Sequence, residues 1–89
     1  MFVPVEVTAD DPAVEVLVGR PVAVAQSYSS LVKNTGSATV YLGGDDTVTD
    51  TDGFPLEPGE VATVSGVGND DTLFAFAATP QTLRVLEAR

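Results

Sequence analysis

Valine recurs at every second position in two runs near the start of the chain. Val3, Val5 and Val7 form the first run, and residues 14–18 repeat the pattern with three more valines. A two-residue period places one set of side chains on one face of a β-strand. Branched side chains favour such strands, and the chain has 15 Val and 10 Thr. This pattern constrains the fold to short strands rather than helices.

Turn-forming residues divide the chain at short intervals. Eight Gly and six Pro leave no long window that suits a helix. Further apolar runs that suit strands occupy residues 22–24, 29–33, 38–42, 61–65, 73–77 and 83–86. Six to eight short strands at this spacing predict an all-β fold, a small antiparallel β-sandwich or barrel. We expect one domain over residues 1–89.

Local patterns predict some of the pairing between these strands. The break at residues 34–36, Asn-Thr-Gly, predicts a tight turn that pairs the strand around Leu31 with residues 38–42 in an antiparallel hairpin. Residues 45–59 read as a long surface loop, with a small apolar anchor at Phe-Pro-Leu. Because Pro4 lacks a backbone donor, we expect its strand at a sheet edge.

The most hydrophobic run, residues 73–77, is predicted to be a central strand. Phe74 and Phe76 share a parity on it, which predicts that both face the core. Tyr41 has the opposite parity to its two apolar neighbours, so we expect it on the surface.

The composition argues against several classes of function. The chain has no His and no Cys, which removes His-based and Cys-based nucleophile pairs, disulfides and the usual zinc ligands. Its net charge is −9, with only four scattered Lys and Arg, which argues against nucleic acid and membrane surfaces as partners. Neighbouring acids such as Asp45 and Asp46 would point apart on a turn, so we expect no catalytic carboxylate pair and no enzyme.

An aspartate-rich segment at residues 45–53 is the one candidate for a cation site. Asp46, Asp50 and Asp52 carry carboxylate oxygens, which Ca²⁺ prefers. The EF-hand spacing fails, because the first and last ligand positions would fall on Val48 and Gly59. Turn formation and solubility are the usual reasons for such a segment. We therefore predict no metal and no cofactor, with these three aspartates as the weak candidates.

The second half of the chain resembles a family of small tailed-phage virion proteins. The resemblance covers residues 31–87 and depends on the order of several short motifs. They are Asn-Thr-Gly at 34–36, Val-Tyr-Leu-Gly-Gly at 40–44, Gly-Phe-Pro-Leu at 53–56, Pro-Gly at 58–59, and Leu-Arg-Val-Leu at 83–86. The resemblance implies a structural protein of the virion.

From this resemblance we expect a protein that decorates a bacteriophage capsid. It would form a homotrimer, bind the major capsid protein on the outer surface of the shell, and stabilise the shell. The candidate contacts with partners or between protomers are Val3, Val5, Val7, Tyr41, Phe54 and Leu56. Residues 1–26 either complete the sandwich or form an extended arm that adds a strand to a partner sheet.

Two alternatives remain open at this point. The first is a β-module of a phage fibre, a tail or a head–tail junction. The second is a calcium-dependent or carbohydrate-binding module of a cell surface, for which an exposed Tyr41 is a weak signal.

Overall fold

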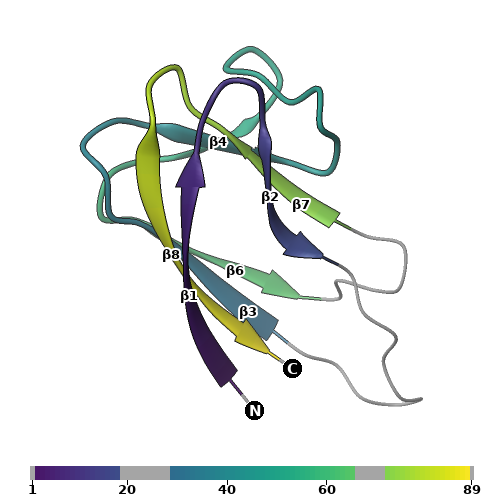
Figure 1. The fold of residues 1–89 in the computed structure, drawn as a ribbon, viewed down its shortest axis with the longest axis vertical. Helices are drawn as coiled ribbons and strands as arrows, with labels where there is room; N and C mark the ends of the chain where they lie inside the picture. Colours follow the sequence, from purple (N-terminus) through teal and green to yellow (C-terminus); the bar gives the residue numbers. More distant parts are fainter. Residues whose placement is uncertain (1, 19–28, 66–71, 89) are drawn as a thin grey trace.

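The computed structural model describes residues 2–18, 29–65 and 72–88, and in these residues the chain forms a β-sandwich (Figure 1). The strands are β1 (Phe2–Ala9), β2 (Val14–Val18), β3 (Ser29–Asn34), β4 (Val40–Gly43), β5 (Phe54–Leu56), β6 (Val61–Ser65), β7 (Thr72–Phe76) and β8 (Gln81–Ala88). One sheet has the order β1-β8-β3-β6 and the other the order β2-β7-β4-β5. All ladders between these strands are antiparallel. The predicted all-β sandwich is confirmed.

The valine runs of the N-terminal third take part in both sheets. β1 pairs with β8 and β2 pairs with β7, so residues 2–18 complete the sandwich. β1 lies at the edge of its sheet, as Pro4 predicts. Residues 19–26 of the predicted arm, with the run at 22–24, lie outside the described residues.

The hairpin predicted between β3 and β4 is wrong. β3 pairs with β8 and β6, whereas β4 belongs to the other sheet. The chain crosses from one sheet to the other after Asn34. The turn that follows is bound to Gln81 at the start of β8, whose side-chain Oε1 accepts from the backbone N–H groups of Ser37 (2.8 Å) and Ala38 (3.2 Å). The turn is thereby fixed to β8 instead of folding β4 back onto β3.

Small and medium aliphatic side chains fill the core between the sheets. Leu83, Val85 and Val32 supply most of the volume from the first sheet, and each is at most 2% exposed. The second sheet contributes the fully buried Ala75 and Ala77, along with Val40, Leu42 and Leu56. Val16 packs into the same cluster next to an irregularity in the β2–β7 ladder.

Asn34 is a fully buried polar side chain at the junction of three segments. Its Nδ2 donates to the carbonyl oxygens of Ala38 and Leu56, both at 2.8 Å, and its Oδ1 accepts from Gly36 N–H at 2.9 Å. The Asn34 backbone carbonyl also accepts from Gly59 N–H at 2.7 Å. One residue therefore ties the end of β3 to the following turn, to the end of β5 and to the β5–β6 turn.

The turn between β5 and β6 joins strands of different sheets. The Glu60 N–H donates to the Glu57 carbonyl at 3.0 Å, and Gly59 has a φ of 85°. A proline followed by a residue with positive φ is the type II pattern, which glycine adopts without a steric penalty. The predicted Pro58-Gly59 turn is confirmed. It makes β5 and β6 the edge strands on the same side of the sandwich.

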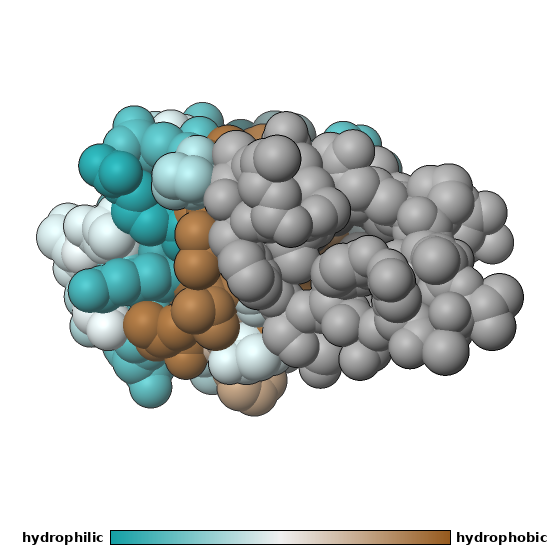
Figure 2. Space-filling model, turned by 90° about the horizontal axis from the view of Figure 1, so that it is seen from below, coloured by the Kyte–Doolittle hydropathy of each residue, from teal (hydrophilic) through white to brown (hydrophobic). Residues whose placement is uncertain are grey.

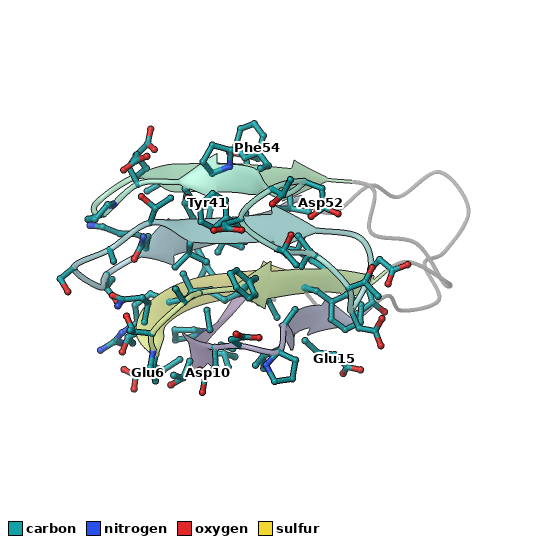
Figure 3. The ribbon with its side chains drawn as sticks, turned by 90° about the horizontal axis from the view of Figure 1, so that it is seen from above. Glu6, Asp10, Glu15, Tyr41, Asp52 and Phe54 are labelled. Carbon is teal, nitrogen blue, oxygen red and sulfur yellow. The ribbon has the colours of Figure 1, made fainter. Side chains whose placement is uncertain are left out.

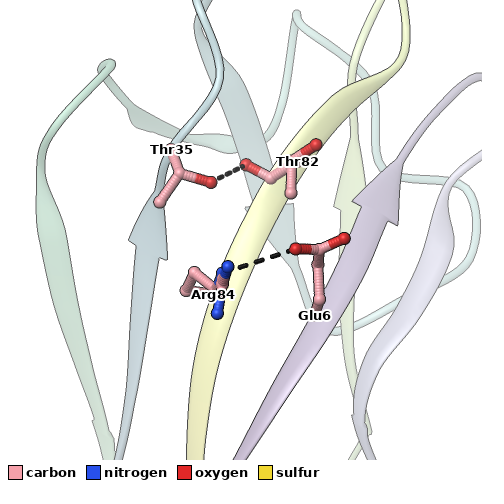
Figure 4. A network of polar contacts seen from close by, with 4 residues as sticks. All are labelled: Glu6, Thr35, Thr82 and Arg84. Atoms are coloured by element: carbon pink, nitrogen blue, oxygen red, sulfur yellow. Dashed lines mark hydrogen bonds and ion pairs between the residues drawn. The ribbon is translucent and has the colours of Figure 1, made fainter.

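The outer face of the β1-β8-β3-β6 sheet is polar at its centre. Arg84 Nε lies 3.4 Å from Glu6 Oε2 on β1 (Figure 4). Lys33 on β3 lies opposite Arg84 in the β3–β8 ladder. The Thr35 hydroxyl donates to the Thr82 carbonyl at 3.0 Å on the same part of the sheet. Both partners of the ion pair are more than half exposed, so the pair adds little stability.

Candidate binding groove at the open edge of the sandwich

The acidic segment at residues 45–53 is held by its own hydrogen bonds. Asp45 Oδ1 accepts from Thr47 N–H at 3.0 Å, and Asp52 Oδ1 accepts from Thr49 N–H at 2.8 Å. Asp50 accepts from the Thr51 hydroxyl at 3.4 Å. These are the local bonds by which aspartate stabilises turns.

The structure does not gather the candidate cation ligands into a site. Among the described residues, no group of three or more acids is placed so that it could hold a metal ion. Asp52 turns one oxygen to the loop backbone, and Asp50 contacts a hydroxyl of its neighbour. Asp46 instead interacts with Asp45. Asp70 and Asp71, which could have added ligands, lie outside the described residues.

Asp45 and Asp46 titrate as a linked pair. A hydrogen bond with Asp45, and then the negative charge of Asp45, raise the pKa of Asp46. Hydrogen bonds from the Thr47 backbone and from Asp46 lower the pKa of Asp45. The two pKa shifts have opposite effects on how the stability of the fold depends on pH. Stability from Asp45 is present above its unfolded pKa and is lost as pH falls through its folded pKa, whereas the raised Asp46 favours folding at the lower pH.

Replacing Asp45 with asparagine is expected to lower the pKa of Asp46. The variant removes the like charge and supplies an amide that can donate to the Asp46 carboxylate. A carboxyl-carbon NMR titration measures this value directly. Asp50→Asn is the control and should leave the Asp46 titration unchanged; an Asp46 pKa that stays raised in Asp45→Asn would contradict the pairing.

Tyr41, Phe74 and Phe76 form a small apolar cluster on the outer face of the second sheet. The prediction that the two phenylalanines face the core is therefore wrong. Ala75 faces the core, so alternation directs Phe74 and Phe76 outward. Leu73 and Ala77 share the core-facing parity of Ala75. Phe76 packs instead beside Tyr41, with ring centroids 6.5 Å apart.

The acidic segment covers part of this cluster. Val48 is 6% exposed and lies over Gly43, while Gly53 approaches the Cβ of Tyr41. Tyr41 is therefore half-buried rather than exposed, which removes the signal for a sugar-stacking surface.

Substituting Gly53 with alanine is expected to destabilise the protein by about 1–3 kcal/mol. A Cβ there would lie 2.6 Å from Tyr41 Cβ and 2.8 Å from the Thr49 carbonyl oxygen, so the segment must shift. Gly44→Ala is the matched control, because a Cβ at Gly44 meets nothing within 4 Å. Urea denaturation compares the two variants, and equal midpoints would contradict the packing of this segment.

A groove of about 500 Å³ opens between the edge strands β5 and β6. Its interior is made by core-facing residues that the edge leaves partly uncovered, with Ala62, Val64 and Leu73 half-buried. Phe54 and Val61 stand at its rim, 67% and 54% exposed. The complete lining is Leu42, Gly43, Gly44, Phe54, Pro55, Leu56, Glu60, Val61, Ala62, Thr63, Val64 and Leu73.

Phe54 is the most exposed large hydrophobic side chain in the described part of the chain. It points outward from β5, on the side of the molecule opposite Glu6, Asp10 and Glu15 (Figure 3). Hydrophobic residues also gather on the face seen from below in Figure 2, where they adjoin hydrophilic ones. An exposed aromatic beside an apolar groove is typical of a docking surface.

The other predicted contact residues have different positions. Leu56 lies in the core, 2% exposed, so of the Phe-Pro-Leu anchor only Phe54 and its proline reach the surface. Val5 and Val7 are half-buried and pack against the core. Val3 lies on β1 opposite Glu87, and its side chain is outside what the structure describes.

The groove was missed at the sequence level, as was the buried role of Asn34. Two signals could have indicated the groove: Phe54 and Leu56 share a parity and so lie on the same face of β5, and β6 has the small Ala62 at a core-facing position. Chemically, the lining offers apolar surface, one hydroxyl and one carboxylate. Such a surface suits binding of an apolar chain.

The described residues form a small antiparallel β-sandwich with an apolar groove between its edge strands β5 and β6. Comparison with family models, with curated proteins and with solved structures finds no match to this chain. In the described residues, no helix is long and apolar enough to cross a membrane.

Proposed function

We propose that the protein is a structural component of a tailed-phage virion that decorates the outer surface of the capsid. In this role it binds the major capsid protein as a homotrimer and stabilises the shell. The observation that supports a binding role is the apolar groove at the open edge, with Phe54 exposed beside it.

Two of the motifs that carry the family resemblance supply half of the residues that line this groove. The Val-Tyr-Leu-Gly-Gly motif contains β4 and supplies Leu42, Gly43 and Gly44 to the lining. The Gly-Phe-Pro-Leu motif contains β5, and the Pro-Gly motif forms the turn to β6.

Stabilisation of a shell follows from several weak contacts acting together. A trimer that touches neighbouring capsid subunits makes its second and third contacts at high effective concentration, which raises the overall affinity. The acidic segments at residues 45–53 keep the exposed loops hydrated and anionic.

Imaging of particles purified from cells that carry the gene tests this proposal. We expect cryo-electron microscopy to show density for the sandwich on the outside of the head, and mass spectrometry of the particles to detect the protein. Density confined to a tail or fibre, or particles without the protein, would overturn the decoration role. Native mass spectrometry at micromolar concentration tests the trimer separately, and a monomer would reject it.

A further inference from the structure

We propose that the groove between β5 and β6 receives an extended segment of a partner protein, with alternating apolar side chains and flanking Lys or Arg residues. The segment pairs with the free edge of β6 as an added strand. This inference deepens the proposed function and rests on it in one respect, namely that the protein is a binding module.

The free edge is the first reason for an extended segment. In the described part of the chain, β6 pairs only with β3 and lies at the end of its sheet. An edge strand presents a row of backbone donors and acceptors that another chain can pair with. β5 is less suited to this role, because it has three residues and its central Pro55 lacks a backbone N–H.

Side-chain alternation is the second reason. Along β6, Ala62 and Val64 face inward and are half-buried, whereas Val61 and Thr63 are exposed. An added strand has the same two-residue period, so every second side chain would enter the space between the sheets. Alanine at position 62 leaves room for those side chains, and Phe54 stands across the groove as an aromatic wall.

The acidic residues in and beside the groove indicate which kind of segment would bind there. Glu60 lines the groove at the turn that closes it, beside the exposed Glu57. Gly44, another lining residue, leads directly into the exposed Asp45 and Asp46. The hydrogen bond with Asp45, and then the negative charge of Asp45, raise the pKa of Asp46, so two carboxyl groups lie close together there.

These acids make a basic segment the complementary partner. Lys33 is the basic residue of the β3–β6 ladder. It lies opposite Val61 on the outer face of the sheet and is not part of the groove lining. A second copy of this chain fits the groove less well, because it has only four Lys and Arg, scattered along the sequence, to place against the acids of the groove.

The test uses the peptide acetyl-Arg-Thr-Val-Thr-Val-Thr-Arg-amide as probe and its twin with Glu in place of both Arg residues. Residue-resolved amide NMR on the intact protein reports where each peptide binds. We expect the Arg peptide to shift the amide signals of Leu42, Ala62 and Val64. The Glu peptide should bind about tenfold more weakly, because it meets the acids with like charges.

Variants separate the groove from the rest of the surface. Phe54→Ser removes an exposed side chain and should weaken the Arg peptide about tenfold, as expected for loss of an aromatic anchor. Leu31→Ser is the matched control, since Leu31 is 38% exposed on the outer face of the neighbouring strand, and it should leave the affinity unchanged. Both changes are at exposed positions, so both variants should fold.

Three results would overturn the inference. They are absence of shifts along β6, equal binding of the two peptides, and loss of affinity in Leu31→Ser as large as in Phe54→Ser. If the amide signals of β6 change with protein concentration alone, a second copy fills the groove and the proposed partner is wrong. Particle imaging is independent of these results, so protein found on the head without peptide binding rejects the groove and keeps the decoration role.

Discussion

Replacing Asn34 with alanine is expected to lower the melting temperature by about 12 to 24 °C. The variant leaves the Leu56 and Ala38 carbonyls and the Gly36 N–H without the partner they have now. Each unsatisfied buried group costs about 1–3 kcal/mol, so we expect a loss of about 3 kcal/mol. For a domain of this size, 1 kcal/mol corresponds to roughly 4–8 °C.

Calorimetry or circular dichroism measures this change, and Ser37→Ala is the control from the same turn. Ser37 is exposed and takes part in the turn through its backbone N–H, so its substitution should change stability by less than about 0.5 kcal/mol. If Asn34→Ala lowered the melting temperature no more than the control does, water would be replacing the amide. The connection between β3 and β5 would then not depend on that side chain.

Truncating Leu83 to alanine is expected to cost about 2–5 kcal/mol, the range for removing a buried leucine from a packed core. Leu83 is fully buried and lies opposite both Val7 and Asn34 in the first sheet. Domains have about 0.05–0.15 kcal/mol of stability per residue, so this single change removes a large share of the total.

Urea denaturation is the appropriate measurement for this variant. A fall in the midpoint with an unchanged slope would show a loss of stability without a change in the surface exposed on unfolding. Leu31→Ala is the control, because that leucine is 38% exposed, and we expect it to cost less than about 1 kcal/mol. Equal losses in the two variants would mean that the core is not centred on Leu83.

The strands and the fold class could be predicted because both are encoded locally. Alternating valines mark β1 and β2, and Pro-Gly at 58–59 marks a turn whose glycine has a positive φ. The β3–β4 connection could not be predicted in this way. The interactions that direct it come from Gln81 and from the Leu56 carbonyl, which are far from the turn in sequence.

The candidate site depended even more on distant residues. Alternation along β7 could be predicted, but not which of its two faces packs on the core: Ala75 does so, whereas Phe76 lies beside the distant Tyr41. The groove likewise arises from two edge strands that lie on the same side of the sandwich. Phe54 was singled out by sequence alone, whereas its neighbours Ala62 and Val64 were not.

The pairing of β1 with β8 has a consequence for how the protein folds. β8 lies between β1 and β3, so the first sheet cannot close until residues 81–88 have left the ribosome. Of the paired strands described, only β4 and β5 follow one another in sequence. Folds dominated by such distant pairings form in about milliseconds to seconds rather than microseconds. During synthesis the valine-rich β1 therefore stays without its partner strand until β8 has been made.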